Sequence, residues 1–168
     1  MSLDIKQVPD YYRTYVRFLK DESVVEALQL SAKDFNYLLN TFSNEKAKYR
    51  YAEGKWSVKD LIQHVIDSER VFAYRALRFA RNDSAQLEGF EQDDYATQAA
   101  SDSRDIKDLM SEFTSTRYST ISFFTSLSEE QLSRKGIASG VEFSVEVLGY
   151  VISGHLMHHL EVIREKYI

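Results

Sequence analysis

The chain has 168 residues, of which 43% are hydrophobic, and it carries a net charge of −5. This length fits a single domain over residues 1–168, and the acidic charge argues against nucleic acid or an anionic membrane surface as a partner. The sequence lacks an 18-residue apolar run for a membrane span, and its first residues lack the apolar core of a secretory signal. With no cysteines, the chain has no disulfides, no thiolate catalysis and no sulfur-ligated zinc, and we expect it to be cytoplasmic.

The N-terminal half contains few residues that break helices. One proline and six glycines in the whole chain favour long helices and almost no strand. Pro9 is suited to open a short helix over residues 10–20. A capping box at Ser23 begins a helix that reaches about Thr41, and Ser57 begins a second one that reaches about Arg81.

The C-terminal half begins with a connection of weak periodicity over residues 82–103, and connections of this length often have a function or cover something. A third long helix is predicted over 104–127. A capping box at Ser128 opens a short helix that stops near Gly136, and a turn region follows. Ser144 then caps a last helix to about Tyr167. Four long helices with short accessory helices predict an all-α four-helix bundle.

The four histidines fall in two places. His64 lies in the second long helix, and His155, His158 and His159 lie in the last one. At ~100° per residue, His155 and His159 lie within roughly 20° of the centre of the apolar stripe at Leu148, and His158 lies about 80° away. Two buried imidazoles one turn apart are costly unless their nitrogens find partners, and a divalent ion satisfies both.

Two interpretations of this pattern compete. A histidine pair with this spacing is more often structural or exposed than metal-bound, but the position of His64 on another core helix favours a three-histidine site. Such a site leaves an open position for water or substrate, with nitrogen–metal distances of about 2.0–2.2 Å. Leu156 stands where the HExxH motif has its glutamate, so the protease class with that motif is not indicated.

Three segments of the chain carry a resemblance to a known family. They are GKWSVKDLIQHVIDSERVFAYRALRFARND, LEGFEQDDY and GYVISGHLMHHLEVIREKY. With them the chain resembles the DinB-like family of metalloenzymes over almost its whole length. The resemblance implies a four-helix bundle, generally a homodimer, with a divalent metal held by one histidine of the second helix and an H-x3-H pair of the last. These positions match His64, His155 and His159, whereas His158 matches no ligand.

The same resemblance implies an enzyme acting on a small molecule. Relatives include transferases and isomerases that use low-molecular-weight thiols such as bacillithiol or mycothiol. We therefore expect thiol-dependent S-transferase or isomerase chemistry, with zinc as the leading metal and nickel as the second. A borrowed thiol suits a chain without cysteine. Two alternatives stay open, namely a metal-dependent hydrolase and a non-catalytic, stress-related metal-binding dimer.

Two further patterns have competing interpretations. Asp60 lies one turn before His64, where it either orients the imidazole or, as we favour, only places a negative charge at the helix start. A basic run follows on the same helix, formed by Arg70, Arg75, Arg78 and Arg81. One of these arginines could bind a substrate carboxylate. The favoured interpretation is pairing with acids of the next connection, which are Glu88, Glu91, Asp93 and Asp94.

Overall fold

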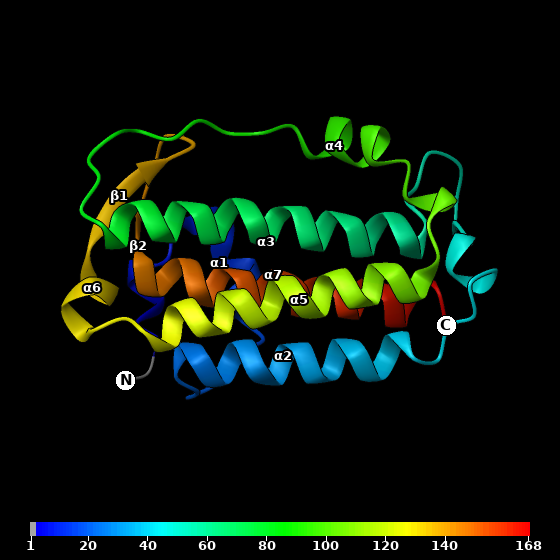
Figure 1. The fold of residues 1–168 in the computed structure, drawn as a ribbon, viewed down its shortest axis with the longest axis horizontal. Coiled ribbons are helices and arrows are strands. Elements are labelled where there is room, and N and C mark those ends of the chain that lie inside the picture. The colour runs from blue at the N-terminus through cyan, green and yellow to red at the C-terminus, as the bar shows by residue number, and fades with distance from the viewer. Residues whose placement is uncertain (1–2) are drawn as a thin grey trace.

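The computed structural model describes residues 3–168, and its long helices lie side by side in a bundle (Figure 1). They are α2 (Val24–Leu39), α3 (Val58–Ala80), α5 (Ile106–Thr125) and α7 (Val145–Lys166). Helix α7 packs against α3, α2 and the short helix α1 (Asp10–Val16), while α5 packs against α2 and α3. The all-α four-helix bundle expected from the sequence is therefore confirmed. None of the helices over residues 3–168 combines the length and apolar character that crossing a membrane requires.

Side-chain caps explain where the helices start. Ser23, Ser57 and Ser128 each accept a hydrogen bond from the backbone N–H three residues later, and the side chain there bonds back to the serine N–H. Asp105 and Ser144 cap α5 and α7 from one side only. The predicted ends of the four long helices agree with the structure to within two residues.

The core consists of two apolar clusters with a buried polar layer between them. One cluster includes Phe79 and Leu148, and the other includes Ile62 and Leu160. Helices α3 and α7 both cross from one cluster to the other. Several of their buried polar residues lie between the two clusters, and they include His64, Ser68, Glu69, Ser153, His155 and His159. A buried polar layer is costly unless its atoms are satisfied, so this layer is where function is to be sought.

Short elements close the two ends of the bundle. They are the 3-10 turns η1 (Ile5–Gln7), η2 (Lys46–Lys48) and η3 (Ser101–Ser103), the helices α4 (Gln92–Ala99) and α6 (Glu129–Ser133), and the strands β1 (Lys135–Ala138) and β2 (Val141–Ser144). Figure 1 shows the connection after α3 running over the bundle to α4, with the hairpin at the other end.

The expectation of almost no strand is confirmed, because the only strands among the described residues form a small hairpin over residues 135–144. Strands β1 and β2 pair antiparallel, with Lys135 opposite Ser144. The turn between them is made by Ser139 and Gly140, which both have positive φ angles of 51° and 73°. Two such residues in succession are the geometry of a tight hairpin, and a serine in the first position conceals it in the sequence. Leu87 adds a short parallel bridge to Ala138, so the connection after α3 is attached to the hairpin.

Candidate metal centre

The polar layer brings three histidine rings together from two helices. The Nε2 atom of His155 lies 3.1 Å from Nε2 of His64 and 3.0 Å from Nε2 of His159. Four-coordinate zinc with bonds of 2.0–2.1 Å places neighbouring ligand nitrogens about 3.3–3.4 Å apart. These two distances are close to the spacing that one ion requires, and the ligand atoms of all three rings lie within 4.8 Å of one another, although 91 residues separate His64 from His155.

Burial keeps these rings neutral. His64, His155 and His159 are 4%, 6% and 9% exposed. Burial lowers the pKa of His64 to about 4. Burial also lowers the pKa of His155 and of His159 well below 6.5, and repulsion from the neighbouring histidines lowers both further. Neutral imidazole is the form that binds metal, so the cluster is ready to do so at neutral pH without losing a proton.

The donor set fits a divalent ion better than it fits hydrogen bonding alone. Hydrogen bonds require at least one of the three rings to place an N–H into the cluster, whereas an ion takes the lone pair of every Nε2. The Ser68 hydroxyl lies 3.5 Å from Nδ1 of His64, at the outer limit for a hydrogen bond. The buried Nδ1 of His159 has no hydrogen-bond partner within residues 3–168. No fourth histidine, aspartate or glutamate of the described chain joins the group.

An open cavity of about 350 Å³ lies against the cluster. His64 and His155 line it, as do the Tyr12 and Tyr15 side chains of α1. The Tyr15 ring packs edge-on against His155, with 5.2 Å between ring centroids. Gly154 permits this arrangement, because a Cβ there would come within 2.6 Å of the Tyr15 carbonyl oxygen. The open side of the histidine cluster therefore faces a pocket that a small molecule can enter.

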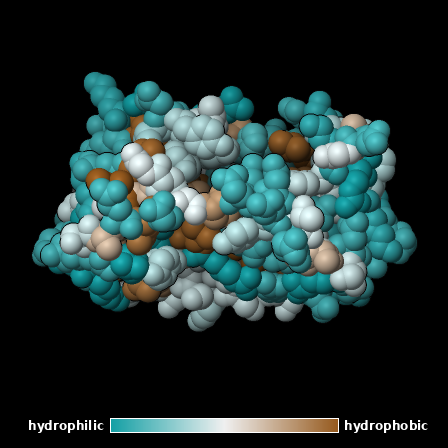
Figure 2. All heavy atoms as spheres, turned by 90° about the horizontal axis from the view of Figure 1, so that it is seen from above, coloured by the Kyte–Doolittle hydropathy of each residue, from teal (hydrophilic) through white to brown (hydrophobic). Residues whose placement is uncertain are grey.

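The face of the molecule that carries α4 is mostly polar. Figure 2 views the molecule from this side and shows a largely hydrophilic surface with small, separate hydrophobic areas. His158 lies outside the cluster, half-buried beside Tyr15 at 5.3 Å between ring centroids. The structure thus separates His158 from its two neighbours in the way that the helical angles predicted.

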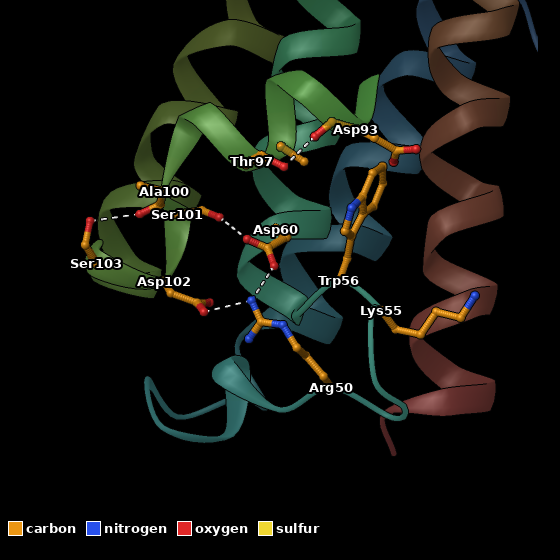
Figure 3. Close-up of a pocket in the computed structure, with 12 residues that line it drawn as sticks. Arg50, Lys55, Trp56, Asp60, Asp93, Thr97, Ala100, Ser101, Asp102 and Ser103 are labelled. Atoms are coloured by element: carbon orange, nitrogen blue, oxygen red, sulfur yellow. Dashed lines mark hydrogen bonds and ion pairs between the residues drawn. The ribbon is translucent and has the colours of Figure 1, made fainter. Parts of the chain in front are cut away.

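Asp60 has the structural position that we favoured. Its carboxylate accepts hydrogen bonds from the Ser57 N–H and from Arg50, both 2.8–2.9 Å long, and also from the Ser101 hydroxyl. Arg50 bridges it to Asp102, as Figure 3 shows. These hydrogen bonds direct the Asp60 carboxylate to Ser57, Arg50 and Ser101, and none in the described chain links it to His64, so Asp60 does not orient the imidazole.

A larger cavity of about 630 Å³ beside Asp60 has no equally reactive group. Its lining includes Arg50, Asp60 and Asp102, and the one guanidinium forms ion pairs with both carboxylates in the network that Figure 3 shows. Trp56 forms part of the same lining, and its ring also packs against His64 at a centroid distance of 4.7 Å. Trp56 therefore separates this cavity from the histidine cluster.

The basic run on α3 does not pair with the acids that we expected. Arg70 pairs with Asp67 and Glu112, and Arg78 pairs with Asp83. No ion pair within residues 3–168 links any arginine of the run to Glu88, Glu91, Asp93 or Asp94. The expected pairing is wrong because Glu88 turns its backbone carbonyl, and not its carboxylate, toward Arg75, while Arg70 and Arg78 pair with other acids.

Several residues beside the cluster could not be identified from the sequence. Trp56 and Tyr15 pack on the rings, but each lies outside the two helices that carry the histidines, and no local pattern specifies its position. Ser68 lies one turn after His64 on the same helix, so the sequence alone places it beside that ring. Glu69, which lies next to Ser68, turns away and forms a buried ion pair with Arg117 of α5. The sequence pattern that could have predicted the Glu69–Arg117 pair is a charged residue on the apolar face of each of the two helices, α3 and α5.

Comparison with known proteins agrees with the four-helix bundle fold. The model of the DinB superfamily matches residues 27–163. YfiT from Bacillus subtilis, described as a probable metal-dependent hydrolase with an unusual four-helix bundle topology, has a TM-score of 0.71 and 15% identity, over 84% of this chain and 85% of YfiT. The mycothiol-dependent maleylpyruvate isomerase has a TM-score of 0.70 and 14% identity, over 86% of this chain and 60% of the isomerase. At these identities the two likenesses concern the fold. The curated proteins contain no match.

Proposed function

Because this chain belongs to the DinB superfamily, we propose that it is a metal-dependent enzyme in which His64, His155 and His159 hold one divalent ion. The observation that carries the proposal is the convergence of three neutral, buried Nε2 atoms beside an open cavity. Zinc is the leading candidate and nickel the second, since nitrogen ligands suit both.

The chemistry we propose is transfer or isomerisation with a low-molecular-weight thiol. When bound, a divalent ion lowers the pKa of a thiol and so makes it a nucleophile at neutral pH. The chain has no cysteine of its own, and its cavity of about 350 Å³ has room for a small molecule beside the histidines. The description of one structural neighbour as mycothiol-dependent supports the same choice.

The chain's own residues would organise this reaction. The three imidazoles fix the position of the reactive centre, and Ser68 lies where its hydroxyl can favour one tautomer of His64. The rings of Trp56 and Tyr15 pack on two sides of the cluster and limit the access of water.

Metal-dependent hydrolysis is the second candidate. It is favoured by the coverage of the two neighbours, because this chain spans 85% of YfiT but only 60% of the isomerase. The isomerase therefore contains a large part that this chain does not match, and the thiol could require that part. A non-catalytic, stress-related role of the bound metal is the outcome if neither activity is found.

The proposal is tested by metal analysis followed by activity screening. The purified protein should contain about one divalent ion per chain, and that form should accelerate the reaction of a thiol with a small electrophile. Removal of the ion by a chelator should abolish the rate, and His64→Ala should abolish it while the far-ultraviolet circular dichroism is unchanged. A metal-dependent rate of ester or amide hydrolysis without any thiol would replace the thiol proposal by the hydrolase.

We also propose a homodimer, which is the commonest symmetric assembly. Tyr37 of α2 and Tyr118 of α5 are 79% and 76% exposed, so the α2–α5 side offers aromatic rings for helix-to-helix contact. A dimer mass by light scattering at micromolar concentration is expected, and a monomer mass would refute it.

A further inference from the structure

The cavity beside the histidines contains a cation that its protein neighbours do not neutralise. Arg75 lines this cavity together with His64 and His155, and it is only 2% exposed. One of its nitrogens donates hydrogen bonds to the carbonyl oxygen of Glu88 at 2.9 Å and to the Ser139 hydroxyl at 2.8 Å. Both acceptors are neutral.

Carboxylates are close in the sequence, but none in the described chain forms an ion pair with the guanidinium. Glu88 presents its backbone carbonyl to Arg75, and its own side chain faces solvent. Glu91 is exposed at the rim of the cavity. Within residues 3–168 no aspartate or glutamate forms an ion pair with Arg75, whereas Arg70, Arg78 and Arg117 each have one. A buried charge without a counter-charge is unfavourable, so this position has to be explained by something other than packing.

The surroundings of Arg75 show the effect of its charge. Burial lowers the pKa of Arg75, because the charged form is separated from water without a compensating anion. Burial raises the pKa of Tyr12, and the nearby Arg75 charge opposes that rise. The Tyr12 hydroxyl and the Arg75 guanidinium therefore lie near one another at the end of the cavity remote from the metal cluster.

The lining residues of α3 show how the cavity extends along that helix. His64, Ser68, Phe72 and Arg75 all line it and lie on one face of the helix, with Arg75 about 20° from His64 around the axis. The backbone positions of His64 and Arg75 are about 16 Å apart along the axis, and the tilt of helix side chains toward the N-terminus brings the guanidinium closer. Phe72 lies between them, with its ring 6.2 Å from the His155 ring and 5.7 Å from the Arg75 guanidinium carbon. The pocket thus has a metal-binding end, an apolar middle and a cationic end.

We propose that Arg75 is the residue that binds the anionic group of the ligand, and that the small molecule used at the histidine cluster carries a carboxylate. A planar guanidinium binds a carboxylate through two parallel hydrogen bonds, and such bonds are stronger in a buried site. The apolar part of the ligand would lie over Phe72, with its reactive group toward the histidines. This inference rests on the proposed function for the role of the bound molecule, but the anion site itself does not require a metal.

A role of Arg75 in structure alone makes a different prediction. The two bonds to Glu88 and Ser139 attach the connection after α3 to the turn of the hairpin, and a neutral donor of similar length would serve that purpose. A structural arginine would not distinguish an anion from a neutral molecule of the same shape. Selectivity for charge is therefore the deciding measurement.

The experiment compares benzoate with benzamide, which have nearly the same shape and differ in charge. Binding to the intact protein is followed by calorimetry and by the Nε–H NMR resonance of Arg75, in metal-free and in metal-loaded samples. Benzoate is expected to bind both samples and to shift that resonance, with benzamide binding at least roughly tenfold more weakly. Arg75→Met should weaken benzoate binding roughly tenfold to a hundredfold, as loss of a hydrogen bond to a charged group predicts.

Controls separate loss of the site from loss of the fold. Arg75→Lys keeps a charge without the planar fork and should retain part of the affinity for benzoate, and Arg70→Met, on the same helix but outside the pocket, should retain all of it. Equal binding of benzoate and benzamide, or full benzoate binding by Arg75→Met, would overturn the inference. Metal stoichiometry is measured separately in each variant, so a protein that binds benzoate but no metal would refute the proposed function and leave the anion site standing. In the active enzyme, competition of benzoate with the electrophile or with the thiol identifies which of them carries the carboxylate.

Discussion

The buried ion pair between Glu69 of α3 and Arg117 of α5 provides a test of how much a buried charge pair contributes to the stability of the bundle. The two side chains are 1% and 2% exposed, and three N–O contacts of 2.8–3.0 Å join them. Arg117 also donates to the Leu28 carbonyl and to the Ser31 hydroxyl of α2. Glu69→Gln removes the negative charge with little change of shape and leaves the guanidinium buried without a counter-charge. We expect a loss of about 3–5 kcal/mol in the free energy of unfolding.

Urea denaturation measures that loss. With a dependence on urea of about 2 kcal/mol per molar, the midpoint should fall by about 1.5–2.5 M. Glu130→Gln removes a partner from the exposed pair with Arg134 and should cost less than about 1 kcal/mol. The double variant Glu69→Leu with Arg117→Met should be more stable than Glu69→Gln, because neither charge is then left alone. A midpoint shift below 0.5 M for Glu69→Gln, or a double variant less stable than the single one, would refute this reasoning.

Three further predictions concern the histidine cluster. His159→Ala should abolish stoichiometric binding of Ni²⁺, which is measured by the fluorescence of Trp56 beside His64. His158→Ala should retain most of that binding. Equal losses in the two variants would mean that the wrong face of α7 was assigned. In Gly154→Ala the new methyl group would clash with the Tyr15 backbone. The variant should therefore lose about 1–3 kcal/mol of unfolding free energy, or α1 should detach from α7 and show faster hydrogen exchange. In metal-free protein the lowered histidine pKa values mean that the unfolded chain takes up protons first, so stability should be constant above about pH 7. It should then fall from pH 6.5 toward 4, by up to about 1.4 kcal/mol per pH unit for each histidine; urea midpoints that stay flat over this range would contradict it.

The parts of the fold that local chemistry determines were predictable from the sequence. Serine caps and the spacing of apolar residues located the four long helices to within two residues. The separation of His155 and His159 from His158 followed from helical geometry alone. The grouping of His64 with that pair rested on the scarcity of histidines and on the family resemblance, and the structure brings the three rings together.

The parts that depend on distant segments were not predictable. The turn region after Gly136 was predicted, but the pairing of strands on its two sides was not, because the tight turn needs a positive φ angle at Ser139, which a serine seldom adopts. The role of Arg75 depends on that turn and on the path of residues 82–91 across the bundle, and neither is encoded near Arg75. Helix α4 is short and weakly amphipathic, so its pattern did not stand out from the loop around it.

The origin of the cluster from α3 and α7 determines when during synthesis it can exist. A nascent chain that has not yet released α7 from the ribosome has only His64, and one imidazole retains a divalent ion poorly. Helix α1, which covers the pocket through Tyr15, also needs α7 for its packing. Capture of the proposed ion would thus be coupled to completion of the bundle, and a chain truncated before α7 would expose apolar faces of the other helices and keep only one of the three histidines.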